Sequence, residues 1–258
     1  MARRFSLAGL LMAAALAAGV ARAGEAGFGG AFEVHVGGLR ALEMEVDGRF
    51  EGERYDVAVD LRTAGFLAAL FEATVEARTE GRVEAADAAA RRLAPRRFSA
   101  SSRNSRKDRD IELSWDGPAP VVRIEPAFDP EPWRVDPADQ AGTIDPLTAV
   151  ALAFAPVPRT ALCNRTVEVF DGRRRYAIDL GEPEETQAEG GIACPALYRR
   201  VAGFEPDLME RMPEWPFRVF FAETAPGLWG VTRAEGDTSF GMAVLRRLLA
   251  GCIARSRD

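Results

Sequence analysis

The stretch LEMEVDGRFEGERYDVAVDL, residues 42–61, decides the fold. In both of its halves, apolar side chains alternate with charged ones. The apolar members of this pattern are Leu42, Met44, Val46, Tyr55, Val57, Val59 and Leu61. A period of two is typical of a β-strand that buries one face and exposes the other. The stretch therefore predicts two neighbouring strands of an antiparallel sheet.

The same alternation recurs along most of the chain. It is clear in residues 75–77, 111–115 and 176–180. Further predicted strands are residues 98–102, 121–125, 197–201, 217–222, 228–233 and 239–249. The last segment also fits the spacing of an amphipathic helix, and a strand is the favoured interpretation. In total the pattern predicts about ten or eleven strands.

Three Asp-Gly steps separate such runs, at Asp47-Gly48, Asp116-Gly117 and Asp171-Gly172. Asp-Gly tolerates the positive φ angles of a type I′ turn, so each step predicts a β-hairpin. Short turns give a continuous antiparallel meander, and such a sheet protects its edges by curling or closing. The predicted fold is mainly β, a single curled antiparallel sheet that forms a half-open β-barrel.

Two segments interrupt the strand pattern. Residues 64–71, AGFLAALF, are an apolar bridge that is either a short helix or a bent loop. Residues 145–154, DPLTAVALAF, predict a helix, because Asp145 suits the N-cap and Pro146 the first helical position. Its apolar side chains share one face, so we expect the helix to pack against the concave side of the sheet. A Pro- and Asp-rich loop at 125–142 precedes the helix, and residues 24–258 are expected to form one domain.

Residues 1–23 have the pattern of a secretory signal peptide. Arg3 and Arg4 supply its positive start, residues 7–20 its apolar segment, and residues 21–23 a cleavage site. Cleavage removes three arginines, so the 258-residue chain of formal charge −6 becomes 235 residues of charge −9. The Ala-, Arg- and Asp-rich, Lys-poor composition favours a high-GC bacterium, and hence the periplasm. Glycines 27, 29 and 30 predict an irregular start to the mature chain.

The composition disfavours several classes of protein. The chain is 47% hydrophobic and 28% charged, which suits a globular domain rather than a disordered chain. Its acidic balance disfavours nucleic acid as a partner, because phosphate binding requires an excess of Lys and Arg. After the signal peptide, no stretch of sequence is long and apolar enough to span a membrane as a helix.

Three cysteines suit an oxidising compartment. Cys163 and Cys194 lie 31 positions apart on either side of a predicted hairpin, and we expect them to form a disulfide. Zinc binding is the alternative, but a close Cys pair and a nearby His are missing from the sequence. Cys252 is left over, and it is either free, bonded to another chain or a replacement for one of the other two.

Catalytic patterns are mostly missing from the sequence. His35 is the single histidine, which excludes a metal site with two or more His ligands, and it is expected on the exposed face of a strand. No G-x-S-x-G turn or Walker loop occurs, and no cofactor or metal is expected. The sequence leaves open a catalytic pair of carboxylates of the kind found in glycosidases. We expect the aspartates at 129, 136, 139 and 145 to be solvated rather than calcium ligands.

Basic residues cluster in three places, at 91–97, 103–109 and 173–175. We expect them to lie in solvated turns and to protect strand edges. The alternative is a contact with anionic lipid or lipopolysaccharide headgroups at the rim of a cavity.

Several motifs occur together in the mature chain. They are G-L-x-A-x-x-M-x-V at Gly38–Val46, D-P-L-T-A at Asp145–Ala149, C-x-R-T-V-x-V-F-D-G-R-R-R-Y at Cys163–Tyr176 and A-C-x-x-x-Y-x-R-V-A-G-F at Ala193–Phe204. With the signal peptide, this set resembles the exported bacterial proteins of the domain of unknown function 3108 family. The resemblance implies a curled β-sheet similar in outline to periplasmic lipoprotein carriers, whose half-barrels hold acyl chains. It implies no chemistry, because fold alone does not determine function.

The leading hypothesis is a non-enzymatic periplasmic protein that binds a lipid, or the acyl chains of a lipoprotein, and supports the cell envelope. The residues expected to line its cavity are Phe66, Leu67, Leu70, Leu147, Val150 and Phe154. A core filled by these same side chains is the alternative structure. A structural or interaction protein that binds an envelope protein through its outer face or an edge strand is the alternative function. A hydrolase with paired carboxylates is the third hypothesis.

Overall fold

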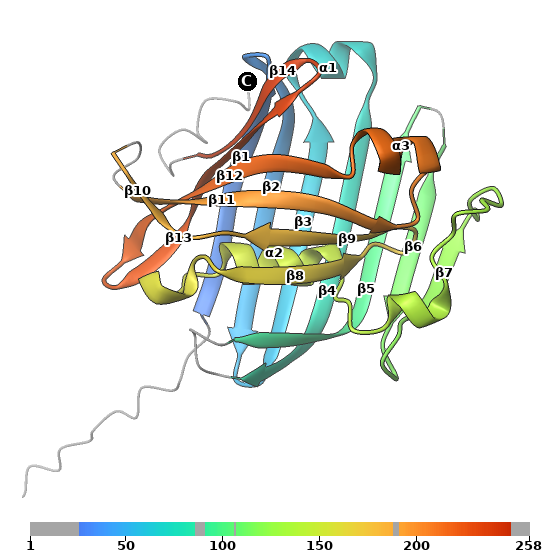
Figure 1. Cartoon of the computed structure of the whole chain (residues 1–258), viewed down its shortest axis with the longest axis horizontal. Helices are drawn as coiled ribbons and strands as arrows, with labels where there is room; N and C mark the ends of the chain where they lie inside the picture. Colours follow the sequence, from blue (N-terminus) through green and yellow to red (C-terminus); the bar gives the residue numbers. More distant parts are fainter. Residues whose placement is uncertain (1–25, 86–90, 106, 188–190, 249–258) are drawn as a thin grey trace, which may run out of the picture.

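The computed structural model describes residues 26–85, 91–105, 107–187 and 191–248 (Figure 1). Its strands are β1 (Ala26–Val36), β2 (Leu39–Glu51), β3 (Arg54–Thr63), β4 (Ala73–Ala85), β5 (Arg92–Asn104), β6 (Arg109–Ser114), β7 (Val121–Glu125), β8 (Arg165–Phe170), β9 (Arg175–Leu180), β10 (Glu184–Thr186), β11 (Gly191–Ala202), β12 (Glu214–Ala225), β13 (Leu228–Thr238) and β14 (Gly241–Arg247). Its helices are α1 (Gly65–Leu70), α2 (Pro146–Phe154) and α3 (Pro206–Arg211). Short 3₁₀ turns cover Pro137–Gln140 and Arg159–Ala161.

All the strands belong to one sheet, in the order β7-β6-β5-β4-β3-β2-β1-β14-β13-β12-β11-β9-β8, with β10 beside β11. Every neighbouring pair is antiparallel, and the first and last long strands of the chain, β1 and β14, lie side by side. Within the described part of the chain, the outer strands β7 and β8 do not pair with each other, so the sheet stays open. The predicted single curled antiparallel sheet is confirmed.

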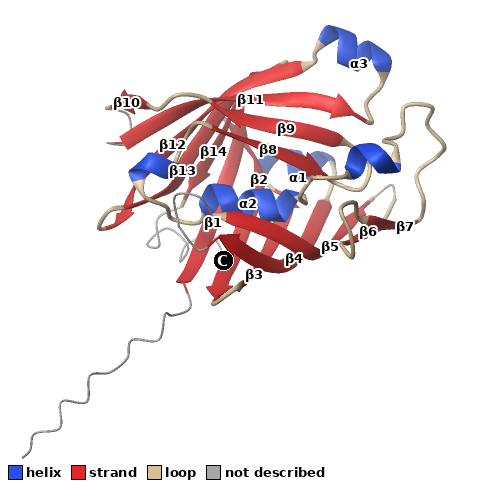
Figure 2. Ribbon diagram, turned by 60° about the horizontal axis from the view of Figure 1, so that its bottom comes forward, coloured by secondary structure: helices blue, strands red, loops and turns tan. Residues whose placement is uncertain are grey.

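The sheet curls until its two ends approach each other. Strands β8, β9 and β11 cross one side of α2, and β3, β4 and β5 lie on the other side (Figure 2). At the turn between β8 and β9, a Cβ on Gly172 would lie 2.9 Å from Ile111 and 3.5 Å from Leu113 of β6. This close approach, together with a φ of +95°, explains why the turn uses glycine.

The concave face of the sheet is apolar and packs on α2. On β3, the side chains of Tyr55, Val57 and Val59 are buried, whereas Asp56 and Asp60 point to the outer face. The core that they share with α2 is formed by Phe32, Val46, Tyr55, Val57, Val59, Ala77, Leu93, Phe98, Leu113, Val135, Leu147, Ala151 and Phe170. Phe154, at the end of α2, contacts both this core and a second one around Leu162 and Phe221. The helix therefore fills the concavity of the sheet, as predicted.

A buried polar cluster fixes α2 in this position. Asp145 caps the helix, and its Oδ1 accepts hydrogen bonds of 2.9 Å from the N–H groups of Leu147 and Thr148. Its Oδ2 accepts from the hydroxyl of Thr148 and, at 3.0 Å, from that of Thr79 on β4. The Tyr55 hydroxyl lies 2.7 Å from that of Thr148. We call Asp145, Thr148, Thr79 and Tyr55 the Asp145 cluster.

All four side chains of the Asp145 cluster are buried. Asp145 is thus not solvated, contrary to the sequence-based expectation, because its carboxylate caps a helix that lies inside the sheet. Burial raises the pKa of Asp145, and the hydrogen bonds from Thr148, Thr79 and Leu147 oppose that rise. A buried polar group is costly unless it is hydrogen-bonded, so this cluster stabilises one placement of α2 over others.

The predicted hairpin of residues 42–61 is present as β2 and β3, but the predicted position of its turn is wrong. Asp47-Gly48 lies inside β2, and the turn to β3 is at Gly52-Glu53 instead. A Cβ on Gly48 would lie 2.2 Å from the Phe28 ring of β1, so this glycine makes room for an aromatic side chain on the concave face. The other two Asp-Gly steps lie in the β6–β7 and β8–β9 connections, as predicted.

Further differences concern the ends of the chain. Glycines 27, 29 and 30 belong to β1, which pairs with β2 from Ala26 onward, rather than to an irregular segment. The short helix α3 was not predicted, and the described residues form fourteen strands rather than ten or eleven. Residues 241–247 form a strand, as favoured. The predicted signal peptide, residues 1–23, and Cys252 lie outside the described residues. None of the helices in the described ranges has the length and apolar character needed to cross a bilayer.

The buried carboxyl of Asp145 predicts a specific dependence of stability on pH. Above the pKa of the unfolded chain, about 3.9, and up to the raised pKa of Asp145, the folded state binds more protons than the unfolded state. The free energy of unfolding of the wild type should therefore fall, relative to that of Asp145→Asn, as the pH rises from about 4. Urea unfolding at a series of pH values measures this difference.

The exposed aspartate Asp129 provides the control for this measurement. Asp129→Asn is the same change at an exposed position, and the fall is assigned to Asp145 only if this variant does not reproduce the result for Asp145→Asn. A wild type that gains stability relative to Asp145→Asn as the pH rises would contradict the proposed cost of burying this carboxylate.

Candidate ligand-binding cleft

The six side chains predicted to line a cavity fall into two groups. Leu147 on α2 is buried, and Val150 and Phe154 on the same helix are half-buried. All three pack on the concave core, and the ring centroid of Phe154 lies 5.0 Å from that of Phe32. These side chains therefore contact the protein itself along the face of α2 that points to the sheet.

The second group lies on α1, at one end of the sheet. Phe66 and Leu70 expose 61% and 64% of their surface, and Leu67 is half-buried. The preceding Gly65 has a φ of +53°, and a Cβ there would lie 2.6 Å from the Arg40 carbonyl oxygen. This close approach holds α1 against β2, away from α2. The structure does not bring the two groups into one wall.

Helix α1 is part of a cluster of exposed apolar side chains, which we call the apolar end. The β1–β2 turn and the β13–β14 turn lie beside each other there, and the Gly37 N–H donates to the Met242 carbonyl at 3.0 Å (Figure 1). The exposed apolar side chains are Leu39, Phe66, Leu70, Phe71, Phe240 and Met242. Phe240 is 83% exposed. Exposed apolar side chains gathered at one end of a sheet mark contact sites for other molecules.

A cleft of about 570 Å³ opens on another side of α2, between that helix, β8 and the start of β5. We call it the α2–β8 cleft. Its apolar lining consists of Leu93, Ile144, Leu152, Val157, Ala161 and Val167. Its charged lining consists of Glu84, Arg91, Arg92, Arg165 and Glu168. The cleft therefore offers an apolar wall with charges along it.

The cleft exists because β8 is the last strand in the order of the sheet. Ile144 covers the second half of its free edge, donating its N–H to the Glu168 carbonyl and accepting from the Phe170 N–H. In the described ranges, no strand pairs with the free edge of the first half, from Arg165 to Val167. This uncovered half of β8 forms one side of the cleft.

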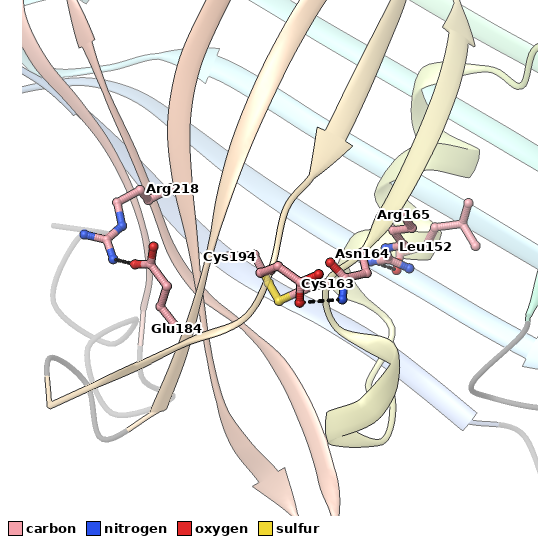
Figure 3. Close-up of a disulfide and its surroundings, with 8 residues drawn as sticks. Leu152, Cys163, Asn164, Arg165, Glu184, Cys194 and Arg218 are labelled. Carbon is pink, nitrogen blue, oxygen red and sulfur yellow. Dashed lines mark hydrogen bonds and ion pairs between the residues drawn. A yellow bond between two sulfur atoms is a disulfide. The ribbon is translucent and has the colours of Figure 1, made fainter.

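Arg165 is the most deeply buried charge of the cleft. Its Nη2 donates to the Leu152 carbonyl at the end of α2, at 3.0 Å (Figure 3). Its Nε is buried without a hydrogen-bond partner among the described residues. Burial lowers the pKa of the Arg165 guanidinium. The arginine therefore has a helix carbonyl as partner instead of a carboxylate.

Arg91 and Arg92 add two more cations to the cleft. The Arg91 guanidinium carbon lies 4.3 Å from the centre of the Phe50 ring, a cation–π contact. Burial lowers the pKa of Arg91 as well. Arg92 is exposed. This part of the first basic cluster thus faces a cleft, whereas the expectation for it was a solvated turn.

The other basic clusters are engaged within the protein. Arg173 pairs with Glu131, and Arg175 lies 3.4 Å from Glu168. Arg103 pairs with Asp110 at 2.7 Å. These residues lie in or beside turns of the sheet, in agreement with the expectation from the sequence.

A disulfide joins Cys163 and Cys194, the expected pair, with the two Cα atoms 5.8 Å apart (Figure 3). Cys163 lies two residues before Arg165 and lines the cleft, and Cys194 lies on β11. The bond fastens the segment just before β8 to β11, which lies two strands from β8 in the sheet. It thereby limits the movement of one wall of the cleft.

Buried carboxylates in the described chain have structural partners. Asp145 caps α2, and Asp171 accepts from the N–H groups of Arg173 and Arg174 in the β8–β9 turn. Neither lines the α2–β8 cleft. Among the described residues, no three His, Cys, Asp or Glu side chains are grouped so that they could hold a metal ion.

Sequence analysis did not single out the α2–β8 cleft or Arg165. Arg165 appeared only within the motif that begins at Cys163, and Arg91 only within a basic cluster. A sequence signal does exist, since Arg165 opens a strand on the same alternating face as Val167 and Val169. A cation at the start of an otherwise apolar face is unusual enough to indicate a site.

Comparison with known proteins places the chain in a family. No curated protein matches it. The chain is similar to a solved structure described as a β-barrel-like protein of domain of unknown function DUF1849 from Brucella abortus, with 11% identity and a TM-score of 0.45. The alignment covers 86% of this chain and 96% of that one. Residues 31–197 match the family described as "Protein of unknown function (DUF3108)", and the chain belongs to that family.

Proposed function

We propose that this protein is a non-enzymatic periplasmic protein that binds the acyl chain of a lipid or lipoprotein in the α2–β8 cleft and supports the cell envelope. The observation that carries the proposal is the apolar wall of that cleft, formed by the half-buried side chains of Ile144, Leu152 and Val167 with their neighbours. Each methylene group that leaves water for such a wall contributes about 0.8 kcal/mol. An acyl chain therefore needs little polar chemistry for binding.

The place of the ligand follows from the packing of α2. The concavity itself is occupied by Leu147, Thr148 and Ala151, all of which are buried. The open space lies on the side of α2 that faces β8, and its volume of about 570 Å³ is within the usual range for small-molecule sites. An acyl chain would lie over the half-buried side chains of Leu152 and Val167, which line this space.

One sequence feature and one structural feature support the proposed location in the periplasm. Residues 1–23 have the pattern of an export signal, and the Cys163–Cys194 disulfide suits an oxidising compartment. A carrier in that compartment would shield acyl chains from water.

A binding measurement tests the acyl-chain proposal. Titration of a fluorescent fatty acid should show saturable binding, with the dissociation constant raised about tenfold or more by Leu152→Gln or Val167→Gln. Both changes place a polar side chain on the apolar wall. Native mass spectrometry of protein purified from a bacterial envelope should show a bound lipid.

Phe66→Gln is the matched control, because it changes an exposed apolar residue at the apolar end. It should leave fatty-acid binding unchanged. The absence of co-purified lipid, together with equal titrations for cleft and control variants, would rule out the cleft as an acyl-chain site.

A second candidate function rests on the apolar end, namely docking on the surface of a lipid bilayer. Its side chains project from two turns and a six-residue helix. The β5–β6 turn adjoins it, since Ala73, just after α1, pairs with Asn104. That turn carries Lys107, an exposed cation that suits anionic headgroups.

Vesicle co-sedimentation tests this second candidate. The protein should bind vesicles that contain phosphatidylglycerol, and the double variant Phe66→Ser/Phe240→Ser should bind at least about tenfold more weakly, because each Phe loses its burial in lipid. Val121→Ser is the control, since Val121 is 64% exposed on β7, outside the apolar end. Equal sedimentation of all three proteins would refute docking through the apolar end.

A further inference from the structure

Some half-buried arginines of the described chain pair with a carboxylate, and those of the α2–β8 cleft belong to the group that does not. Arg173, Arg175 and Arg233 each pair with a glutamate. Within the described residues, neither Arg165 nor Arg91 has a carboxylate within ion-pair distance, and burial alone acts on the pKa of each guanidinium. A buried guanidinium without a counter-ion is costly, so its presence on the wall of a cleft calls for an explanation.

The carboxylates that line the cleft do not supply that counter-ion. Glu168 lies 3.4 Å from Arg175 and 3.8 Å from Arg199, on the opposite face of β8 from Arg165. Glu84 is exposed. The interior of the cleft is therefore positive, although the chain as a whole has a formal charge of −6.

Both arginines are held in place before any ligand binds. Arg165 is fixed through its Nη2 by the Leu152 carbonyl, and its Nε has no partner in the described chain. Arg91 is held over the Phe50 ring. A guanidinium presents five N–H donors in a rigid plane, which matches the oxygens of a carboxylate or phosphate. Fixed donors lose little conformational entropy when such a group binds.

We infer that Arg165 and Arg91 bind the anionic headgroup of a single-chain amphiphile whose acyl chain lies along the apolar wall of the same cleft. The inference rests on the proposed acyl-chain function and adds the chemistry of the headgroup, a carboxylate or a phosphate. The headgroup supplies the counter-ion that Arg165 lacks. The acyl chain extends over Leu152 and Val167, which line the cleft beside Arg165.

Calorimetric titration with matched ligands tests this inference. The purified, disulfide-bonded protein is titrated with palmitate, with hexadecanol, with lysophosphatidylglycerol and with inorganic phosphate. Palmitate or lysophosphatidylglycerol should bind about tenfold or more tightly than hexadecanol, because an ion-paired hydrogen bond exceeds a neutral one. Inorganic phosphate alone should bind weakly, since it gains nothing from the apolar wall.

Variants of the two cleft arginines test whether the preference for anionic amphiphiles arises in the α2–β8 cleft. Arg165→Gln should weaken the binding of the anionic amphiphiles by about tenfold and leave hexadecanol within about twofold. Arg91→Gln should act in the same direction. Arg165→Lys, which keeps the charge, should retain part of the preference and guards against a folding defect. Arg49→Gln is the charge-matched control, because Arg49 is exposed and pairs with Asp56 on the outer face.

Failure of the headgroup inference and failure of the acyl-chain proposal would give different binding results. Equal affinity for palmitate and hexadecanol, unchanged in Arg165→Gln and Arg91→Gln, would overturn the headgroup inference and leave the acyl-chain function standing. Failure of all three amphiphiles to bind would overturn both. Tight binding of inorganic phosphate without any amphiphile would overturn the inference in favour of a free anion as ligand.

Discussion

The hydrogen bonds that the buried Asp145 carboxylate accepts hold this structure in its particular form. They cap α2 through Leu147 and Thr148 and tie it to β4 through Thr79. The curled sheet alone would leave a trough with an apolar wall. With α2 fixed inside it, the same wall becomes a closed core, and the polar groups of the cluster satisfy one another.

The placement of α2 determines where a ligand can bind. Because the helix fills the concavity, open space remains beside the helix, where β8 ends the sheet and half of its edge is uncovered. The backbone carbonyl of Leu152, near the C-terminal end of α2, accepts a hydrogen bond from Arg165 and orients its guanidinium toward that space. The Cys163–Cys194 disulfide restrains β8, the strand that carries Arg165. The packing of the core, the position of the α2–β8 cleft and the orientation of Arg165 thus all depend on the position of α2.

Local chemistry predicted much of the fold, and long-range curvature explains what it missed. Asp145 and Pro146 marked the start of α2, and Asp171-Gly172 marked a turn, because caps and turns depend on neighbouring residues. Asp47-Gly48 had the same turn chemistry, but Phe28 from another strand occupies the space above Gly48. The position of α1 and the existence of the α2–β8 cleft depend on how far the sheet curls. No local sequence pattern encodes the curvature of the sheet.

Hydrogen exchange of α2 tests the central claim, that the helix permanently fills the sheet. The amides of Ala149 and Ala155, which donate to Asp145 and Ala151, should exchange only through global unfolding, with or without a bound amphiphile. The amide of Ala68 on the exposed helix α1 should exchange faster, through local opening. Exchange of the α2 amides at a free energy several kcal/mol below that of global unfolding, while the strands stay protected, would contradict the account, because the helix would then leave the trough and open it to ligand.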